Sequence, residues 1–173
     1  MEGAEKTANV DSQNMHAMKV DVTIKSDWEA ALKEVTNRWG RIDIVINNAG
    51  TTYKNKVTRI SEISSMSCLS GIELIIQPTL EVTEDEFDRC FRVNVKSIYH
   101  SVAVVVPRLI EQKSGGAIIN VASIGAMRPR PGLVWYNSSK GAVANATKGL
   151  AAEYGSHQIR VNAVCPLLSG TGL

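Results

Sequence analysis

Short apolar runs alternate with segments of helical period along this chain of 173 residues, and this alternation constrains the fold more than any other feature. A strand buried in a parallel sheet is apolar throughout, whereas an amphipathic helix repeats its apolar residues every three or four positions. Strands that alternate with helices pack as an α/β domain. The pattern therefore predicts one α/β domain with a parallel sheet over residues 1–173.

The boundaries of the expected elements follow from this reading. Apolar runs predict strands over residues 16–22, 42–46, 117–121 and 159–164. Helical spacing predicts helices over residues 26–39, 84–112 and 136–154, while residues 2–13 read as the end of a further helix. Pro129, Pro131 and Gly132 mark a loop before the last helix.

Several side chains predict where the helices begin, end and bury their surface. Two pairs have the spacing of a capping box: Ser26 with Glu29, and Thr83 with Glu86. Glycines that can end a helix stand at two positions: Gly40 and Gly155. The first helix has four aligned apolar residues that predict a buried stripe: Trp28, Leu32, Val35 and Trp39.

Composition excludes several classes of protein. A net charge of +2 and scattered basic residues do not indicate a nucleic-acid partner. The three cysteines and three histidines form no metal-ligand pattern, and the cysteine count suits a reducing compartment. No run of about 18 apolar residues indicates a membrane span. We therefore expect a cytoplasmic protein with no metal, no membrane anchor and no nucleic-acid partner.

Three residues indicate proton-transfer chemistry. Tyr136 and Lys140 stand four positions apart in a predicted helix, so they share one face. Ser123 follows the predicted strand 117–121, thirteen residues before Tyr136. Hydride reduction of a ketone leaves an alkoxide that a tyrosine can protonate, although a pKa of about 10 makes an unperturbed tyrosine a poor catalyst near neutrality. A neighbouring ammonium stabilises the phenolate, and a serine hydroxyl can hold the carbonyl oxygen.

Together with further motifs, these residues resemble the short-chain dehydrogenase/reductase family, in particular its 3-oxoacyl reductase and polyol dehydrogenase branch. The matching text is NNAG at 47–50, Asn94, INVAS ending at Ser123, YNSSK at 136–140 and RVNAVCP at 160–166. The resemblance covers residues 14–56 and 78–170. It implies a doubly wound, Rossmann-like parallel sheet with helices on both faces, and an enzyme that interconverts a carbonyl and a secondary alcohol with NADP or NAD.

The resemblance also assigns roles to individual residues. It implies a catalytic set in which Asn94 places a water beside Lys140: Asn94, Ser123, Tyr136 and Lys140. It implies cofactor contacts on the adenine side, along a turn, and on the nicotinamide side: Asp21 and Val22; Asn48, Ala49 and Gly50; Val164, Pro166 and Leu167, with Tyr136 and Lys140. The family usually has Pro-Gly where this chain has Pro166-Leu167.

The loop between Ser123 and Tyr136 is where a substrate would be selected. Ser123, Met127, Leu133 and Trp135 are candidates for lining the substrate pocket. Arg128 and Arg130 could meet an acidic group, but a solvated loop is the favoured interpretation of both arginines. The substrate, the direction of the reaction and the choice between NAD and NADP do not follow from the sequence.

The family's dinucleotide site opens with a glycine-rich turn that this sequence lacks, since Gly3 is its one glycine before Gly40. We therefore expect an incomplete domain, truncated at both ends, without the first two strands of the fold. Strand 42–46 would become an exposed apolar edge. Either strand 16–22 pairs with it instead, or the fold is only partly stable.

Residues 57–77 interrupt a stretch that reads smoothly if Lys56 is joined to Pro78. The segment begins with Val and ends with Gln, whose codons can supply the GT and AG boundaries of a eukaryotic intron. We hypothesise a translated, unspliced intron. The alternative is a genuine surface insertion, which loops tolerate.

Three interpretations of function remain open from the sequence. The first is an NAD(P)-dependent oxidoreductase with Tyr136 as general acid and base. The second is an inactive remnant, or a fragment of a gene, that cannot hold the dinucleotide. The third is an interaction module that forms a homodimer or homotetramer through helices 84–112 and 136–154.

Overall fold

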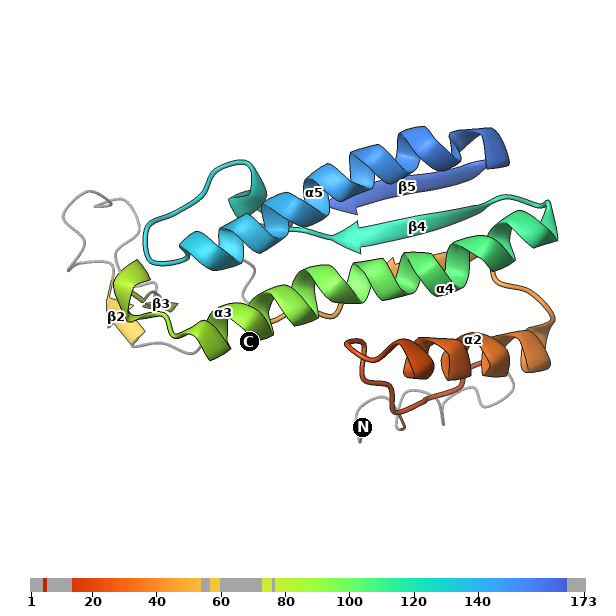
Figure 1. Cartoon of the computed structure of the whole chain (residues 1–173), viewed down its shortest axis with the longest axis horizontal. Helices are drawn as coiled ribbons and strands as arrows, with labels where there is room; N and C mark the ends of the chain where they lie inside the picture. The colour runs from red at the N-terminus through yellow and green to blue at the C-terminus, as the bar shows by residue number, and fades with distance from the viewer. Residues whose placement is uncertain (1–4, 6–13, 54–56, 60–72, 76, 168–173) are drawn as a thin grey trace.

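The computed structural model describes residue 5 and residues 14–53, 57–59, 73–75 and 77–167. Its elements in chain order are α2 (Lys25–Trp39), β1 (Ile44–Asn47), β2 (Val57–Arg59), β3 (Glu73–Ile75), η3 (Thr79–Glu81), α3 (Glu84–Phe91), η4 (Arg92–Lys96), α4 (Ser97–Gln112), β4 (Gly116–Val121), η5 (Ile124–Ala126), α5 (Val134–Tyr154), η6 (Gly155–His157) and β5 (Ile159–Val164). Figure 1 shows α4 and α5 lying along the strands of a small sheet. The predicted α/β class with a Rossmann-like parallel sheet is confirmed.

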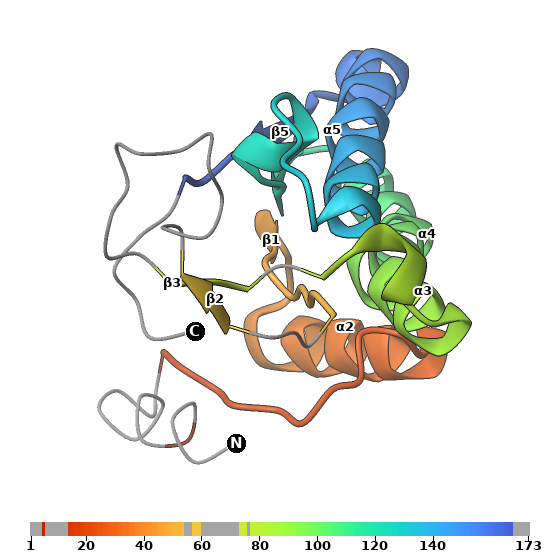
Figure 2. The same cartoon turned by 90° about the vertical axis from the view of Figure 1, so that its left-hand side faces the viewer.

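The sheet has the order β1-β4-β5, and all three strands are parallel. Val45 pairs with Ile118, which pairs with Val161, so these three side chains lie side by side on one face. They form a buried core with Val105 and Leu109 of α4. Figure 2 shows α2, α4 and α5 together on this face.

The opposite face of the sheet carries exposed apolar side chains. Side chains alternate between the two faces of a strand, and the alternate positions of β1, Ile44 and Ile46, are 60% and 61% exposed. Val164 of β5 is 51% exposed. Among the described residues, helices therefore cover one face, and the expectation of helices on both faces is wrong for this part of the chain. The predicted exposed edge at 42–46 is found, because β1 has β4 as its only neighbour in the described sheet. The apolar run at 42–46 is typical of a buried strand, but β1 is buried on one face only, because no described element covers its outer residues.

Residues 16–22 do not form the predicted strand. Within this segment the backbone has no strand partner among the described residues, and β1 pairs only with β4 there. The segment instead ends in a turn in which the Asp21 carboxylate accepts the backbone N–H of Thr23 at 2.8 Å. The indole N–H of Trp28 donates to the carbonyl of Val22 at 2.9 Å. Local hydrogen bonds replace the expected ladder.

Helix α2 differs from expectation at its start and in its packing. It begins at Lys25 after Ile24, with no side-chain cap, so the predicted box of Ser26 with Glu29 does not form. None of its residues is buried, so the predicted stripe is wrong, although Trp28 packs partly against the core. The helix has no neighbour on its outer side among the described elements. It ends at Gly40, as predicted, with φ of 75°.

The long helix predicted over 84–112 is found as α3, a π-helical segment η4, and α4. The predicted capping box of Thr83 and Glu86 is confirmed in both directions. At the other end of the domain, Gly155 does not stop α5 by a left-handed turn. Its φ is −58°, and η6 continues to Gln158, which takes φ of 60°. The 3-10 turn thus delays the reversal into β5 by three residues.

Segment 57–77 contains a short antiparallel pairing. Val57 of β2 pairs with Ile75 of β3, and Arg59 pairs with Glu73. The backbone N–H of Gln77 donates to the carbonyl of Gly132 at 2.9 Å, which attaches the end of the segment to the loop before α5. Residues 60–72 lie outside the described part of the chain, so the intron hypothesis stays a prediction.

Candidate active site

The candidate site lies where the strands end and α5 begins. Figure 1 shows β4 and β5 pointing toward the side of the molecule at which α5 begins. The carboxyl ends of parallel strands are the usual place for a ligand in an open α/β sheet. Ser123 follows β4 directly, and Tyr136 and Lys140 lie in the first two turns of α5.

Lys140 is buried at this end of the sheet. Its side chain is 5% exposed, and its ammonium Nζ donates to the backbone carbonyl of Val121 at 2.7 Å. Burial lowers the pKa of Lys140, while the Cys90 thiol opposes this shift. An ammonium has three donors, so one carbonyl leaves donors free for a further acceptor. A buried cation of this kind is a frequent mark of a functional site.

Gly50 brings the turn after β1 against this ammonium. A Cβ added to Gly50 would lie 3.2 Å from Nζ of Lys140 and 3.5 Å from Oδ1 of Asn94. A side chain here would crowd both groups, so the glycine permits the close approach of the backbone. The structure thus brings three of the predicted site residues together.

Asn94 lies in the π-helical segment and binds the residue that follows Gly50. Its Oδ1 accepts the backbone N–H of Thr51 at 2.7 Å, and its Nδ2 donates to the Thr51 carbonyl at 2.8 Å. Nδ2 also donates to Oγ of Ser139 at 2.9 Å, with Cys90 Sγ at 3.4 Å. The amide is fully engaged by the protein, so its side chain holds the turn against α5.

Cys90 lies one helical turn before Asn94 and is fully buried beside Ser139. Its Sγ is 3.7 Å from the Ser139 hydroxyl oxygen and 3.8 Å from the Thr51 carbonyl oxygen. Burial raises the pKa of the Cys90 thiol, against the opposing effects of the Ser139 hydroxyl and of Lys140. The thiol is therefore a neutral packing group within the site.

Ser123 is the N-cap of the short helix η5, which packs against α5. Its Oγ accepts the backbone N–H of Gly125 at 3.1 Å, which leaves the hydroxyl proton available to another acceptor. A Cβ on Gly125 would lie 2.1 Å from Oδ1 of Asn137, so η5 and α5 are in intimate contact. Ser123 is half-buried.

Tyr136 is half-buried on the same helix as Lys140, four residues earlier and therefore on the same face. Its backbone carbonyl accepts the hydroxyl of Ser139 at 2.7 Å. Tyr53 is fully buried, and its hydroxyl interacts with the backbone of Trp135 and Tyr136. Burial raises the pKa of Tyr53, and those backbone contacts partly offset the rise. The contacts of the Ser139 hydroxyl and of the Tyr53 hydroxyl with this backbone fix the start of α5.

The residues predicted to line the cofactor fall into two groups. The first is exposed around the ends of β1 and β5: Asn48, Ala49, Gly50, Val164, Pro166 and Leu167. Within it, the Pro166 carbonyl accepts the N–H of Ile124 and so ties this edge to η5. The second group, Asp21 and Val22, lies in the turn before α2. Hydrogen bonds from Thr23 lower the pKa of Asp21.

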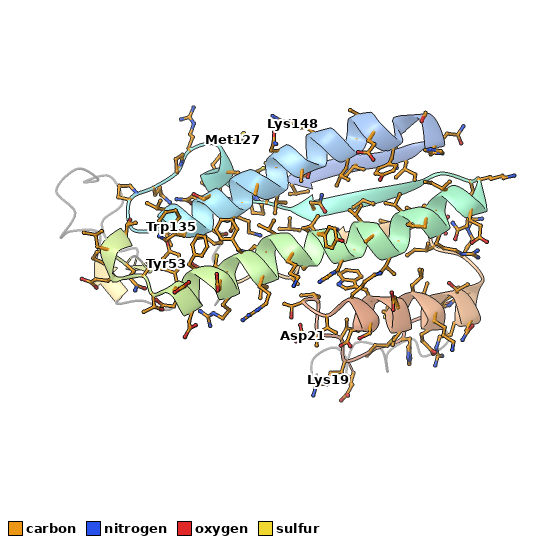
Figure 3. All side chains as sticks on the ribbon, in the orientation of Figure 1. Lys19, Asp21, Tyr53, Met127, Trp135 and Lys148 are labelled. Atoms are coloured by element: carbon orange, nitrogen blue, oxygen red, sulfur yellow. The ribbon has the colours of Figure 1, made fainter. Side chains whose placement is uncertain are left out.

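The predicted substrate-lining residues lie in different surroundings. Leu133 is buried, and Trp135 packs edge-on against Phe87 with ring centroids 5.4 Å apart. Met127 is 65% exposed, and Figure 3 shows it apart from Tyr53 and Trp135. The loop residues nearest α5 instead line a hollow of about 480 Å³ with its outer face: Gly125, Ala126, Pro129, Arg130, Pro131, Val134, Asn137, Ser138 and Gly141.

The two arginines of this loop also differ. Arg128 is exposed, whereas Arg130 is half-buried and its backbone carbonyl accepts the Asn137 amide at 3.1 Å. Neither has an ion-pair partner among the described residues.

Sequence reasoning missed four residues of the site: Thr51, Tyr53, Cys90 and Ser139. Two of them carried a usable signal. Cys90 precedes Asn94 by one helical turn, and Ser139 is one turn from Tyr136 and adjacent to Lys140. Tyr53 and Thr51 come after the strand, where no periodicity indicates which way a side chain points.

The described part of the chain contains neither a membrane-spanning helix nor a cluster of metal-binding side chains. No helix there is long and apolar enough to cross a membrane. No group of three or more His, Cys, Asp or Glu side chains in the same part of the chain could hold a metal ion.

Comparison with known proteins places this geometry in context. The sequence profile of the short chain dehydrogenases matches residues 1–173. The 4-formylbenzenesulfonate dehydrogenase of Comamonas testosteroni is 41% identical over 154 residues, which is 89% of this chain and 52% of that protein. The 3-oxoacyl-[acyl-carrier-protein] reductase of Thermotoga maritima is 31% identical over 147 residues, 85% of this chain and 50% of its own length. The chain spans about half the length of these relatives.

Solved structures show the same fold. The 3-ketoacyl-(acyl-carrier-protein) reductase of Brucella melitensis, complexed with NADH, superposes with a TM-score of 0.80 at 34% identity. The match covers 95% of this chain and 61% of that one. A xylitol dehydrogenase bound to NAD+ also gives a TM-score of 0.80, at 28% identity, over 99% of this chain and 58% of its own.

Proposed function

The chain belongs to the short-chain dehydrogenase family, and from this premise we propose that it carries the proton-transfer residues of an NAD(P)-dependent oxidoreductase. The reaction interconverts a carbonyl compound and a secondary alcohol. The relatives of this chain include a protein named 4-formylbenzenesulfonate dehydrogenase and one named 3-oxoacyl-[acyl-carrier-protein] reductase. The chain spans about half of their length, and the activity of those whole proteins comes to this chain only as a proposal.

One observation carries the proposal: a buried ammonium with unused donors stands at the carboxyl end of the sheet, on the helix face that bears a tyrosine. Lys140 reaches Val121 with one hydrogen bond and faces the glycine turn. Burying an ammonium away from water is costly unless hydrogen-bond or charged partners replace the lost water. A ligand rich in hydroxyl groups would supply the missing acceptors.

The residues of this chain divide the chemistry between them. When bound, the nicotinamide supplies the hydride that adds to the carbonyl carbon. Ser123 donates its hydroxyl proton in a hydrogen bond to the carbonyl oxygen and so orients it. Tyr136 transfers its phenolic proton to that oxygen, which completes the alcohol. Lys140 stabilises the phenolate that remains. In the oxidative direction Tyr136 takes the alcohol proton back.

The residues present fit the nicotinamide side of NAD or NADP. The free donors of Lys140 suit the hydroxyls of a ribose. Gly50 has no side chain to crowd that position, and Asn48, Ala49 and Pro166, which follow the ends of β1 and β5, are exposed. The sequence has no glycine-rich turn for the pyrophosphate, so we expect this chain alone to bind the dinucleotide much more weakly than its relatives.

Titration calorimetry with NADPH and with NADH tests the proposal directly. Wild-type chain is expected to bind one of them, and Lys140→Met is expected to bind it at least about tenfold more weakly, since it loses charge-assisted hydrogen bonds. Arg38→Met, a change on the exposed side of α2, serves as the charge control. Equal binding by the two variants, or no binding by wild type, would contradict the proposed site and favour the inactive remnant.

The proposal includes self-association through the helices at 84–112 and 136–154. Exposed Tyr99 on α4 and the small residues Ala142 and Ala146 on α5 would allow close packing of two copies. Light scattering that finds a dimer or tetramer, dispersed by Tyr99→Glu, supports this arrangement, whereas a monomer argues against it. We also propose a cytoplasmic location, which fractionation of the source cells would test.

A further inference from the structure

Ser139 occupies the junction between the elements that carry the candidate catalytic residues. Resting on the function proposed above and deepening it, we propose that Ser139 is a positioning residue for Tyr136. Its hydroxyl fixes the first turn of α5 against Asn94, and through Asn94 against the turn that follows β1. No role for this residue followed from the sequence motifs.

The hydroxyl of Ser139 uses both of its hydrogen-bonding capacities. It donates its proton to the backbone carbonyl of Tyr136 at 2.7 Å and accepts Nδ2 of Asn94 at 2.9 Å. One oxygen atom thus joins the backbone of the proton donor to the π-helical segment of a different helix. A hydroxyl has one proton to give, so this arrangement fixes its direction.

Asn94 extends the connection to the turn after β1. Its amide makes hydrogen bonds to both the N–H and the carbonyl of Thr51. A continuous path of hydrogen bonds therefore runs from Thr51 through Asn94 and Ser139 to Tyr136. Gly50, which faces the ammonium of Lys140, is the residue before Thr51. The path therefore connects Thr51, which follows the glycine that faces Lys140, with the backbone of Tyr136.

Burial makes this connection difficult to replace. The side chains of Ser139 and Asn94 are 0% and 1% exposed. If the hydroxyl is removed, bulk water cannot reach Nδ2 of Asn94, and a buried donor loses a partner at a cost of about 1–3 kcal/mol. The neighbouring Cys90 thiol is a weak acceptor and cannot substitute fully. Relief then requires a small movement of α5 relative to η4.

The adjacent Ser138 provides a matched control within the same helix. Its hydroxyl also bonds back to the helix, donating to the carbonyl of Val134 at 2.8 Å. It is exposed and contacts no other element through a hydrogen bond in the described residues. Ser138→Ala therefore makes the same chemical change without cutting the path to Asn94.

The test compares wild type, Ser139→Ala and Ser138→Ala, each as the full chain. In the absence of cofactor, the NMR ring signals of Tyr136, assigned with Tyr136→Phe, are expected to shift in Ser139→Ala and to stay at their wild-type positions in Ser138→Ala. Amide exchange of the first turn of α5 is expected to accelerate in Ser139→Ala alone. In turnover with NADPH and a carbonyl substrate, the kcat of Ser139→Ala is expected to be about tenfold below that of wild type, while its KM for the carbonyl substrate changes little.

Ser139→Cys covers the case in which Ser139→Ala does not fold, because it keeps the buried volume and weakens both hydrogen bonds. Ring signals and kcat in Ser139→Ala or Ser139→Cys that match those of Ser138→Ala would overturn the proposal. If wild type shows no turnover, the proposed function fails, while the ring signals and amide exchange still decide whether Ser139 positions Tyr136.

Discussion

The two faces of the sheet differ sharply in how completely they are covered. On one face Val45, Ile118 and Val161 are buried beneath α4 and α5. On the other face Ile44 and Ile46 are more than half exposed. The polar residues of the candidate site follow the same division, since Asn94, Ser139 and Lys140 are all buried on the covered side.

Residues 42–166 supply a covering layer for one face of the sheet but not for the other. On the covered side, the apolar core, the hydrogen-bonded polar groups and the N-terminal ends of α4 and α5 all lie within residues 42–166. The open side presents apolar strand residues without a covering helix in the described part of the chain. The buried residues of the candidate site, Asn94, Ser139 and Lys140, therefore lie on the covered side.

The largest contrast is expected between two isoleucines on opposite faces. Ile118→Ala should lower the free energy of unfolding by about 2–5 kcal/mol, because it leaves a cavity in a packed core. Ile46→Ala should change it by no more than about 0.5 kcal/mol, because the side chain is exposed. Urea unfolding measures both. Similar losses for the two variants would mean that the outer face is covered in solution.

The next contrast lies between Gly125 of η5, which packs against the first turn of α5, and Gly149 within α5 itself. Gly125→Ala should destabilise by about 1–3 kcal/mol, since its Cβ would lie 2.1 Å from the buried Asn137 amide oxygen. Gly149→Ala should stabilise by about 1 kcal/mol, because a Cβ there meets nothing within 4 Å and alanine favours a helix. Thermal unfolding distinguishes the signs; a stable Gly125→Ala protein would refute the close contact of η5 with α5.

A smaller effect is expected from the pH dependence of the buried ammonium. Burial lowers the pKa of Lys140, so between the folded value and the unfolded value of about 10.4 the unfolded chain binds more protons. Stability contributed by this group therefore rises with pH across that window. The Cys90 thiol, whose pKa burial raises, acts oppositely above its unfolded pKa of about 8.5.

Replacing Cys90 separates the contribution of Lys140 to the pH dependence of stability from that of the thiol. Cys90→Ala should gain stability, relative to Cys90→Ala/Lys140→Met, as the pH rises from neutral toward the unfolded lysine pKa. Urea midpoints at a series of pH values measure the difference. A difference that stays constant with pH would show that Lys140 is solvated in the folded protein.

Much of the covered side was predictable because its signals are local. Thr83 and Glu86 make a capping box from their own spacing, and Gly40 adopts the left-handed turn that ends α2. The apolar runs at 117–121 and 159–164 became β4 and β5 because each has a neighbour in the sheet. The spacing of Tyr136 and Lys140 likewise places them on one helix face.

The failures arose where tertiary partners decide the outcome. Residues 16–22 have a strand-like pattern, but a strand needs a neighbour, and local bonds at Asp21 prevail. The stripe on α2 is only half-buried: Trp28 packs against the core, whereas Trp39 is exposed. Ser139 and Thr51 were overlooked because their importance comes from Asn94, which is distant in sequence from both.

The central claim is that Tyr136 passes a proton to a carbonyl oxygen, and the oxidation of NADPH with a panel of ketones tests it most directly. Tyr136→Phe should reduce turnover about 10²–10⁴-fold, whereas Tyr99→Phe, a change at an exposed tyrosine, should leave it unchanged. Turnover in Tyr136→Phe equal to that of wild type would contradict the account.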